Sequence, residues 1–132
     1  MSAPKTTLAF VLALLSVTAC GDDDDDGASP AQRMGVGAAC DSADDCPPDL
    51  MLDCLPFKGG YCGLEGCAND QDCPPGSACV AHDDGNTYCF LICTDKVQCN
   101  YTRPVEDESN CSSNITFSDD QAGGIKACVP PS

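Results

Sequence analysis

The chain has 132 residues, with 21 Asp and Glu against six Lys and Arg, and a formal net charge of −15 at pH 7. Nucleic acid and anionic lipid headgroups repel such a chain, which argues against a nucleic-acid partner. Thirteen cysteines are too many for a reducing compartment unless they bind metal, so we expect an exported protein with disulfide bonds.

Residues 1–19 are predicted to be an export signal that is removed. Lys5 supplies a positive charge, and an apolar run follows from Leu8 to Val17, interrupted by Ser16. The run of about ten residues is half of the roughly 20 that a membrane-spanning helix needs. We therefore expect cleavage and not a transmembrane anchor. The remaining chain keeps all 21 acidic residues and loses Lys5, which gives a charge of −16.

The segment Val17-Thr18-Ala19-Cys20 resembles a bacterial lipobox. This resemblance implies a diacylglycerol on the Cys20 thiol, cleavage just before Cys20 and a membrane anchor. The alternative is ordinary secretory cleavage at the same bond, which releases a secreted protein with an unmodified thiol. The odd cysteine count favours the lipid, because removing Cys20 from thirteen leaves an even twelve. Gly21 in place of an Asp after the lipidated Cys favours the outer membrane.

Residues 20–39 are predicted to be a flexible, acidic tether. Asp22 to Asp26 repel one another, and the rest of the segment is mostly Gly, Ala, Ser and Pro. Five consecutive aspartates do not converge on one ion as alternating ligands do, so a calcium site here is disfavoured.

Residues 40–132 are predicted to form a domain that depends on disulfides. Leu, Ile, Val and Phe make up only 15 of its 93 residues, a composition that by itself favours disorder. Six disulfides would contribute on the order of 12–24 kcal/mol, comparable to the net stability of a domain. The twelve cysteines are Cys40, Cys46, Cys54, Cys62, Cys67, Cys73, Cys79, Cys89, Cys93, Cys99, Cys111 and Cys128.

The spacing of these cysteines predicts three consecutive four-cysteine units, at about 40–66, 67–92 and 93–132. Each unit opens with two cysteines separated by five residues. A good N-cap residue follows each first cysteine by two positions, and an Asp or Gln that can bond back to the cap comes three residues later. The pairs are Ser42 with Asp45, Asn69 with Asp72, and Asp95 with Gln98. Each opening is therefore expected to be a short helical turn.

The second half of each unit is predicted to be a β-hairpin, within a small fold that has little regular secondary structure. The expected strand pairs are 52–55 with 61–62, 78–81 with 87–90, and 115–117 with 125–128. Four cysteines allow three pairings, and bonds from first to third and from second to fourth would join each hairpin to its turn.

The third unit contains a longer stretch, Asn100 to Asn110, which we predict as a candidate recognition surface or a solvated loop. The pattern Cys67-x5-Cys73-x5-Cys79 resembles part of whey-acidic-protein domains and of the N-terminal cysteine-rich region of Dickkopf proteins. The adjacent cysteine pair of the former is missing, so no functional residue is carried over. The whole chain more closely resembles the cysteine-rich repeat lipoproteins of Gram-negative bacteria.

No motif in the sequence predicts catalysis or a cofactor. His82 is the one histidine and is expected to be an exposed hairpin residue, so an enzyme is not expected. Zinc is an alternative use of cysteine, with suitable gaps at Cys62/Cys67 and Cys89/Cys93, but an exported chain favours disulfides. Calcium is a further alternative, through Asp44, Asp45, Asp70, Asp72, Asp83 and Asp84.

The function expected from the sequence is that of a lipid-anchored protein of the bacterial cell envelope. Its rigid, acidic domain would act as a non-catalytic binding or structural module for an unknown protein partner. The alternatives are a protease inhibitor, which would present a loop preorganised by disulfides, and a calcium-dependent adhesion module.

Overall fold

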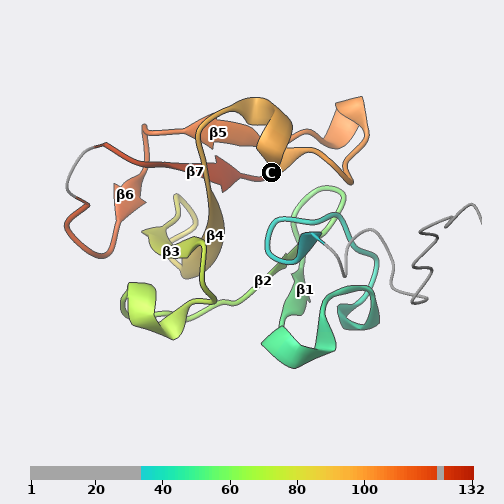
Figure 1. The fold of residues 1–132 in the computed structure, drawn as a ribbon, viewed down its shortest axis with the longest axis horizontal. Helices are drawn as coiled ribbons and strands as arrows, with labels where there is room; N and C mark the ends of the chain where they lie inside the picture. The colour runs from blue at the N-terminus through green and yellow to red at the C-terminus, as the bar shows by residue number, and fades with distance from the viewer. Residues whose placement is uncertain (1–33, 122–123) are drawn as a thin grey trace, which may run out of the picture.

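A computed structural model describes residues 34–121 and 124–132 (Figure 1). The expected signal segment, Cys20 and the first part of the expected tether lie outside these residues. The described chain forms short strands and 3₁₀ turns linked by loops. None of its helices is long and apolar enough to cross a membrane.

Six disulfides cross-link the domain, which is small and disulfide-rich. They are Cys40–Cys54, Cys46–Cys62, Cys67–Cys79, Cys73–Cys89, Cys93–Cys111 and Cys99–Cys128. When the cysteines are read in fours, every bond joins the first to the third or the second to the fourth. In each set of four, three sulfur atoms lie within 4.8 Å of one another, so the two bonds pack side by side.

The three C-x5-C openings contain similar 3₁₀ turns: η1 at Ala43–Asp45, η3 at Asp70–Asp72 and η4 at Lys96–Cys99. The residue at the third position of each turn accepts the backbone N–H of its N-cap. These bonds join Ser42 to Asp45 at 3.1 Å, Asn69 to Asp72 at 3.3 Å, and Asp95 to Gln98 at 3.4 Å. The expected capping contacts are therefore present in all three openings. Two further turns are η2 at Pro48–Leu50 and η5 at Val105–Asp107.

The strands form two antiparallel sheets (Figure 1). The smaller sheet pairs β1 (Asp53–Leu55) with β2 (Tyr61–Gly63). The larger sheet has the order β5-β7-β4-β3-β6. Its strands are β3 (Ser77–Ala81), β4 (Thr87–Cys93), β5 (Asn110–Ser112), β6 (Thr116–Phe117) and β7 (Lys126–Val129).

The prediction of a hairpin between 115–117 and 125–128 is wrong. β7 pairs with β5, where Cys111 lies opposite Cys128, and with β4 on its other side. β6 pairs instead with β3. An isolated two-stranded hairpin is marginal in water, whereas strands added to both edges of the β3–β4 hairpin share a larger sheet. The last third of the domain is therefore built onto the middle third.

Residues 34–39, which the sequence placed in the flexible tether, belong to the packed domain. The Gly37 N–H donates to the Cys62 carbonyl at 2.9 Å, and the Cys62 N–H donates to the Ala38 carbonyl at 2.9 Å. Val36 and Ala38 are buried. Gly37 and Ala38 thus pair with Cys62 of β2, so this part of the expected tether packs against the domain.

The main core joins side chains from all three parts of the domain, including Leu55, Tyr61, Phe90 and Ala127. Tyr61 is fully buried, and its hydroxyl donates to the Cys128 carbonyl at 2.9 Å and accepts the Leu91 N–H at 3.1 Å. Burial raises the pKa of Tyr61 well above its ordinary value, so the phenol stays neutral. This hydroxyl links the first part of the domain to the other two.

We expect Tyr61→Phe to lower the free energy of unfolding by about 2–3 kcal/mol, because it removes the bonding partner of two buried backbone groups. Urea unfolding of the oxidised protein, followed by circular dichroism, measures the change. Tyr101→Phe is the matched control, because Tyr101 is 71% exposed and its change should stay within about 0.5 kcal/mol. Equal effects of the two substitutions would contradict the role given to Tyr61.

Candidate functional site

The five-stranded sheet is strongly curled. β5 and β6 are at opposite edges, four strand spacings apart, which would be about 19 Å in a flat sheet. Ser112 ends β5 and Thr116 begins β6, and four residue steps reach at most about 14 Å. The sheet must therefore bend until its two edges approach each other. We call this approach of β5 to β6, bridged by Ser113 to Ile115, the seam.

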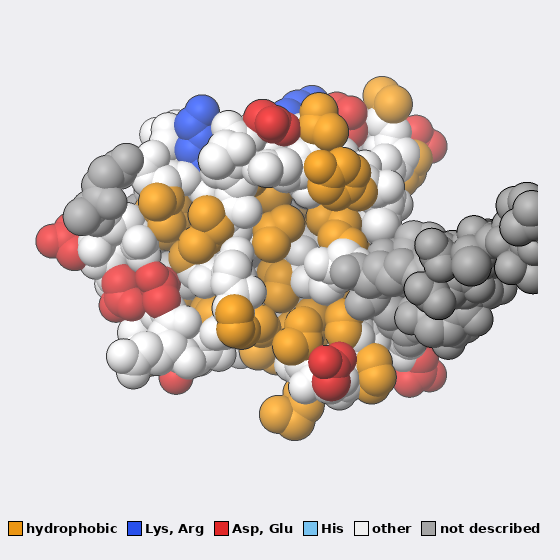
Figure 2. Space-filling model, viewed as in Figure 1, with side chains coloured by type: hydrophobic (Ala, Val, Ile, Leu, Met, Phe, Trp, Pro, Cys, Tyr) orange, Lys and Arg blue, Asp and Glu red, His pale blue; other side chains and the backbone are white. Residues whose placement is uncertain are grey.

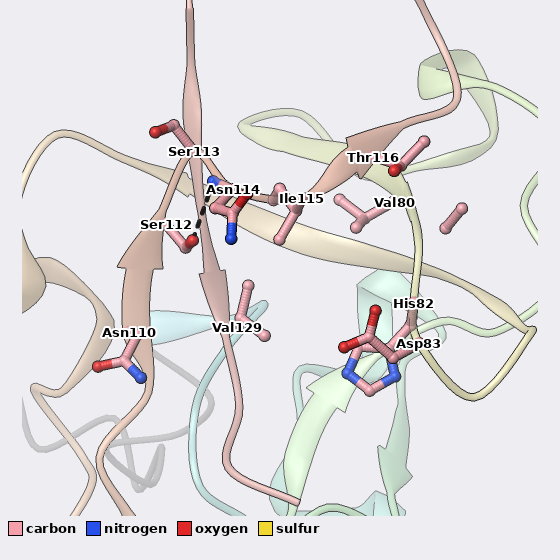
Figure 3. A pocket seen from close by; sticks show the side chains of 11 residues that line it. Val80, His82, Asp83, Asn110, Ser112, Ser113, Asn114, Ile115, Thr116 and Val129 are labelled. Atoms are coloured by element: carbon pink, nitrogen blue, oxygen red, sulfur yellow. Dashed lines mark hydrogen bonds between the residues drawn. The ribbon is translucent and has the colours of Figure 1, made fainter.

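A pocket of about 320 Å³ opens at the seam (Figure 3). In Figure 3, His82 and Asp83 lie on one side, Asn110 and Ser112 on the other, and Val129 between them. The lining residues are Val80, Ala81, His82, Asp83, Asn110, Ser112, Ser113, Asn114, Ile115, Thr116 and Val129. The wall is mostly neutral: five amide or hydroxyl side chains accompany one carboxylate. We call this cavity the seam pocket.

His82 is not the exposed hairpin residue expected from the sequence, because its side chain is only 15% exposed. Its ring makes edge contacts with Phe57, Tyr88 and Phe90, at centroid distances of 5.3, 5.7 and 5.9 Å. Its Nδ1 lies 3.5 Å from Asp84 Oδ1, yet forms no hydrogen bond in the described structure. The imidazole thus closes the aromatic cluster on the side of the seam pocket.

Four of the six carboxylates weighed for calcium accept hydrogen bonds within the protein. Asp84 accepts the Tyr88 hydroxyl at 2.7 Å and the Asn86 N–H at 2.9 Å, and these bonds hold its pKa below the usual range. Asp70 accepts the Cys79 N–H at 2.8 Å and a bond from the Gln121 amide. Asp45 and Asp72 cap their turns. Within the described residues, the groups that bring three potential metal ligands together consist of cysteines alone.

The sulfur atoms weighed for zinc are bonded elsewhere. Cys62 and Cys67 pair with Cys46 and Cys79, and Cys89 and Cys93 pair with Cys73 and Cys111. A disulfide sulfur is not a thiolate, which is the form that binds zinc. In the oxidised domain, all four cysteines weighed for zinc are therefore in disulfide bonds.

The loop from Asn100 to Asn110 has a structural role that the sequence analysis missed. Arg103 lies near its middle and is only 7% exposed. Its guanidinium donates to the carbonyls of Asp107 at 2.7 Å, Gly60 at 2.7 Å and Lys58 at 2.6 Å. The Arg103 side chain therefore fastens the loop to the β1–β2 turn and does not project toward a partner.

The same loop carries exposed apolar residues on either side of Arg103. Tyr101 and Val105 are exposed, as are Met51, Ile92 and Val97 elsewhere. Figure 2 shows hydrophobic side chains gathered over the middle of one face, with acidic side chains toward its margin. Scattered apolar residues are normal on a protein surface, so this face alone does not specify a partner.

Comparisons with protein-family models, with curated proteins and with solved structures find no match to this chain. The role of the seam pocket therefore has to follow from the chemistry of its lining residues. Sequence reasoning missed it because its polar residues come from segments that meet only when the sheet curls. The one local signal of the pocket is the short stretch of chain between β5 and β6. It indicates a curled sheet only when these two strands are known to lie at opposite edges.

Proposed function

We propose that this protein is a lipid-anchored protein of the bacterial cell envelope whose disulfide-bonded domain is a non-catalytic binding module. The observation that carries the proposal is the pairing of all twelve cysteines of the described domain with one another. Cys20 is then the one cysteine left over, and it lies in the lipobox-like segment. Outer-membrane delivery follows from Gly21 at the next position.

The repeated pairing supports a domain of three four-cysteine modules, at about 40–66, 67–92 and 93–132. Each module has a capped 3₁₀ turn at its opening and the same two-bond pattern. The first two contain a hairpin, whereas the third supplies strands to the sheet of the second. This arrangement suits a rigid support for a binding surface, because the disulfides and not long helices or strands hold the modules together.

The site chemistry favours binding over catalysis. A nucleophilic mechanism needs a hydroxyl or thiol within hydrogen-bond reach of a base. The structure of the described residues gives no hydrogen bond between His82 and a serine or threonine hydroxyl. The Ser112 hydroxyl instead accepts the Asn114 N–H at 3.1 Å. This bond ties the Ser112 side chain to the pocket wall, which supports binding as the role of the pocket.

The anchor is tested by the intact mass of the protein extracted from bacterial membranes, before and after reduction and alkylation. We expect a chain that begins at Cys20, carries acyl groups and gains twelve alkyl groups only after reduction. Cys20→Ser is the control, and it should abolish acylation while leaving the twelve thiols protected. An unacylated wild-type product would reject the anchor, and thiols that alkylate without reduction would reject the disulfide-bonded module.

A further inference from the structure

We propose that the seam pocket binds one or two units of a neutral saccharide. The proposal deepens the proposed binding function by naming a ligand class, and it rests on that function but not on the lipid anchor. The first argument is the chemistry of the wall. Asn110, Asn114, Ser112 and Thr116 offer both donors and acceptors, as sugar hydroxyls require. Ile115 and Val129, which are only partly buried, add the apolar surface that the C–H groups of a sugar ring can contact.

Charge narrows the class of ligand. Asp83 is the only acidic residue in the lining, and the lining contains neither Lys nor Arg. The acidic chain as a whole disfavours phosphates and carboxylates. A cationic ligand would need more than one carboxylate to replace its hydration, because a charge removed from water is costly unless it is paired. An uncharged polar ligand avoids both problems.

Size and rigidity agree with this choice. A volume of about 320 Å³ is at the lower end of small-molecule sites, which suits one or two sugar rings more than a folded partner. The wall is held at both ends, by the Cys93–Cys111 bond, whose Cys111 lies within β5, and by the pairing of β6 with β3. A wall fixed before the ligand arrives loses little conformational entropy on binding. The edge strands are too short to bind a long added peptide strand.

The test is an NMR titration of the full exported chain, oxidised and labelled with ¹⁵N. The neutral probes are N,N′-diacetylchitobiose and maltose, and the cationic probe is the deacetylated diamine of the first. We expect at least one neutral disaccharide to shift amide signals at 80–83 and 110–116, with a dissociation constant of about 1 mM or lower. No shift with either neutral probe at about 20 mM would overturn the proposal. Shifts with the diamine alone would also overturn it, in favour of a cation site.

Asn114→Ala tests the wall directly. The Asn114 side chain is exposed, and the bond to Ser112 uses its backbone N–H, so the fold should be kept. Loss of one hydrogen-bonding side chain should weaken binding about tenfold. The control is Gln71→Ala, because Gln71 is also an exposed amide but lies outside the pocket lining. Equal affinities of the two variants would contradict binding in the seam pocket, whereas the mass measurement on membranes decides the anchor separately.

Discussion

Arg103→Ala is expected to lower the free energy of unfolding of the oxidised protein by about 3–4 kcal/mol. The guanidinium donates to three carbonyl groups that belong to two parts of the domain, at Lys58, Gly60 and Asp107. Hydrogen bonds from a charged donor contribute about 1.5–3 kcal/mol each, and bonds made by one side chain do not add fully. Burial of this side chain means that water replaces the lost bonds poorly. Denaturation in urea measures the loss.

The geometry of the β1–β2 turn fixes the positions of the carbonyl groups that Arg103 contacts. Gly60 has a φ of +69°, and a Cβ atom there would lie only 1.9 Å from the Cys40 carbonyl oxygen. The turn is therefore compact and presents the carbonyls of residues 58 and 60 toward the loop. A planar guanidinium can donate in several directions at once, whereas the amine of a lysine is a single point of charge.

Two comparison variants separate this mechanism from a simple change of charge. Arg103→Lys keeps the charge but should recover less than half of the lost stability, because one amine cannot reach all three carbonyls. Lys126→Ala removes a cation from an exposed position on β7 and should change stability by less than about 0.5 kcal/mol. Full rescue by lysine would show that charge, and not the directed hydrogen bonds, holds the loop.

Local features of this fold could be read from the sequence because they depend on neighbouring residues. The capped turns at Ser42, Asn69 and Asp95 need only a cap and a partner three residues later. The hairpin of β3 and β4 follows from the turn sequence Asp83 to Asn86 between two short strand-forming runs. Disulfide richness likewise follows from the cysteine count.

Long-range features could not be read in the same way. The pairing of β6 with β3, the packing of Val36 and Ala38, and the burial of Arg103 all join segments far apart in the chain. An arginine in a polar loop has the same local sequence whether it points to solvent or into the protein. Ser112 and His82 meet at one pocket only because the sheet curls, and residue type alone does not report that curvature.

Removal of the Cys99–Cys128 bond, as Cys99→Ala with Cys128→Ala, is expected to cost about 4 kcal/mol of unfolding free energy. The bond spans 29 residues, the longest separation among the six, and both cysteines are fully buried. A cross-link over a longer loop removes more conformations from the unfolded chain. It also holds β7, which lies between β5 and β4, to the end of η4.

The matched comparison is Cys67→Ala with Cys79→Ala, which opens a bond over 12 residues and should cost about 3 kcal/mol. Urea unfolding gives both values, once mass measurement has shown that the remaining ten cysteines of the domain are oxidised in each variant. A larger loss for the longer loop means that restriction of the unfolded chain dominates the stability of this small core. The reverse order means that packing around Cys79 dominates, and then the few apolar residues contribute more to stability than their number suggests.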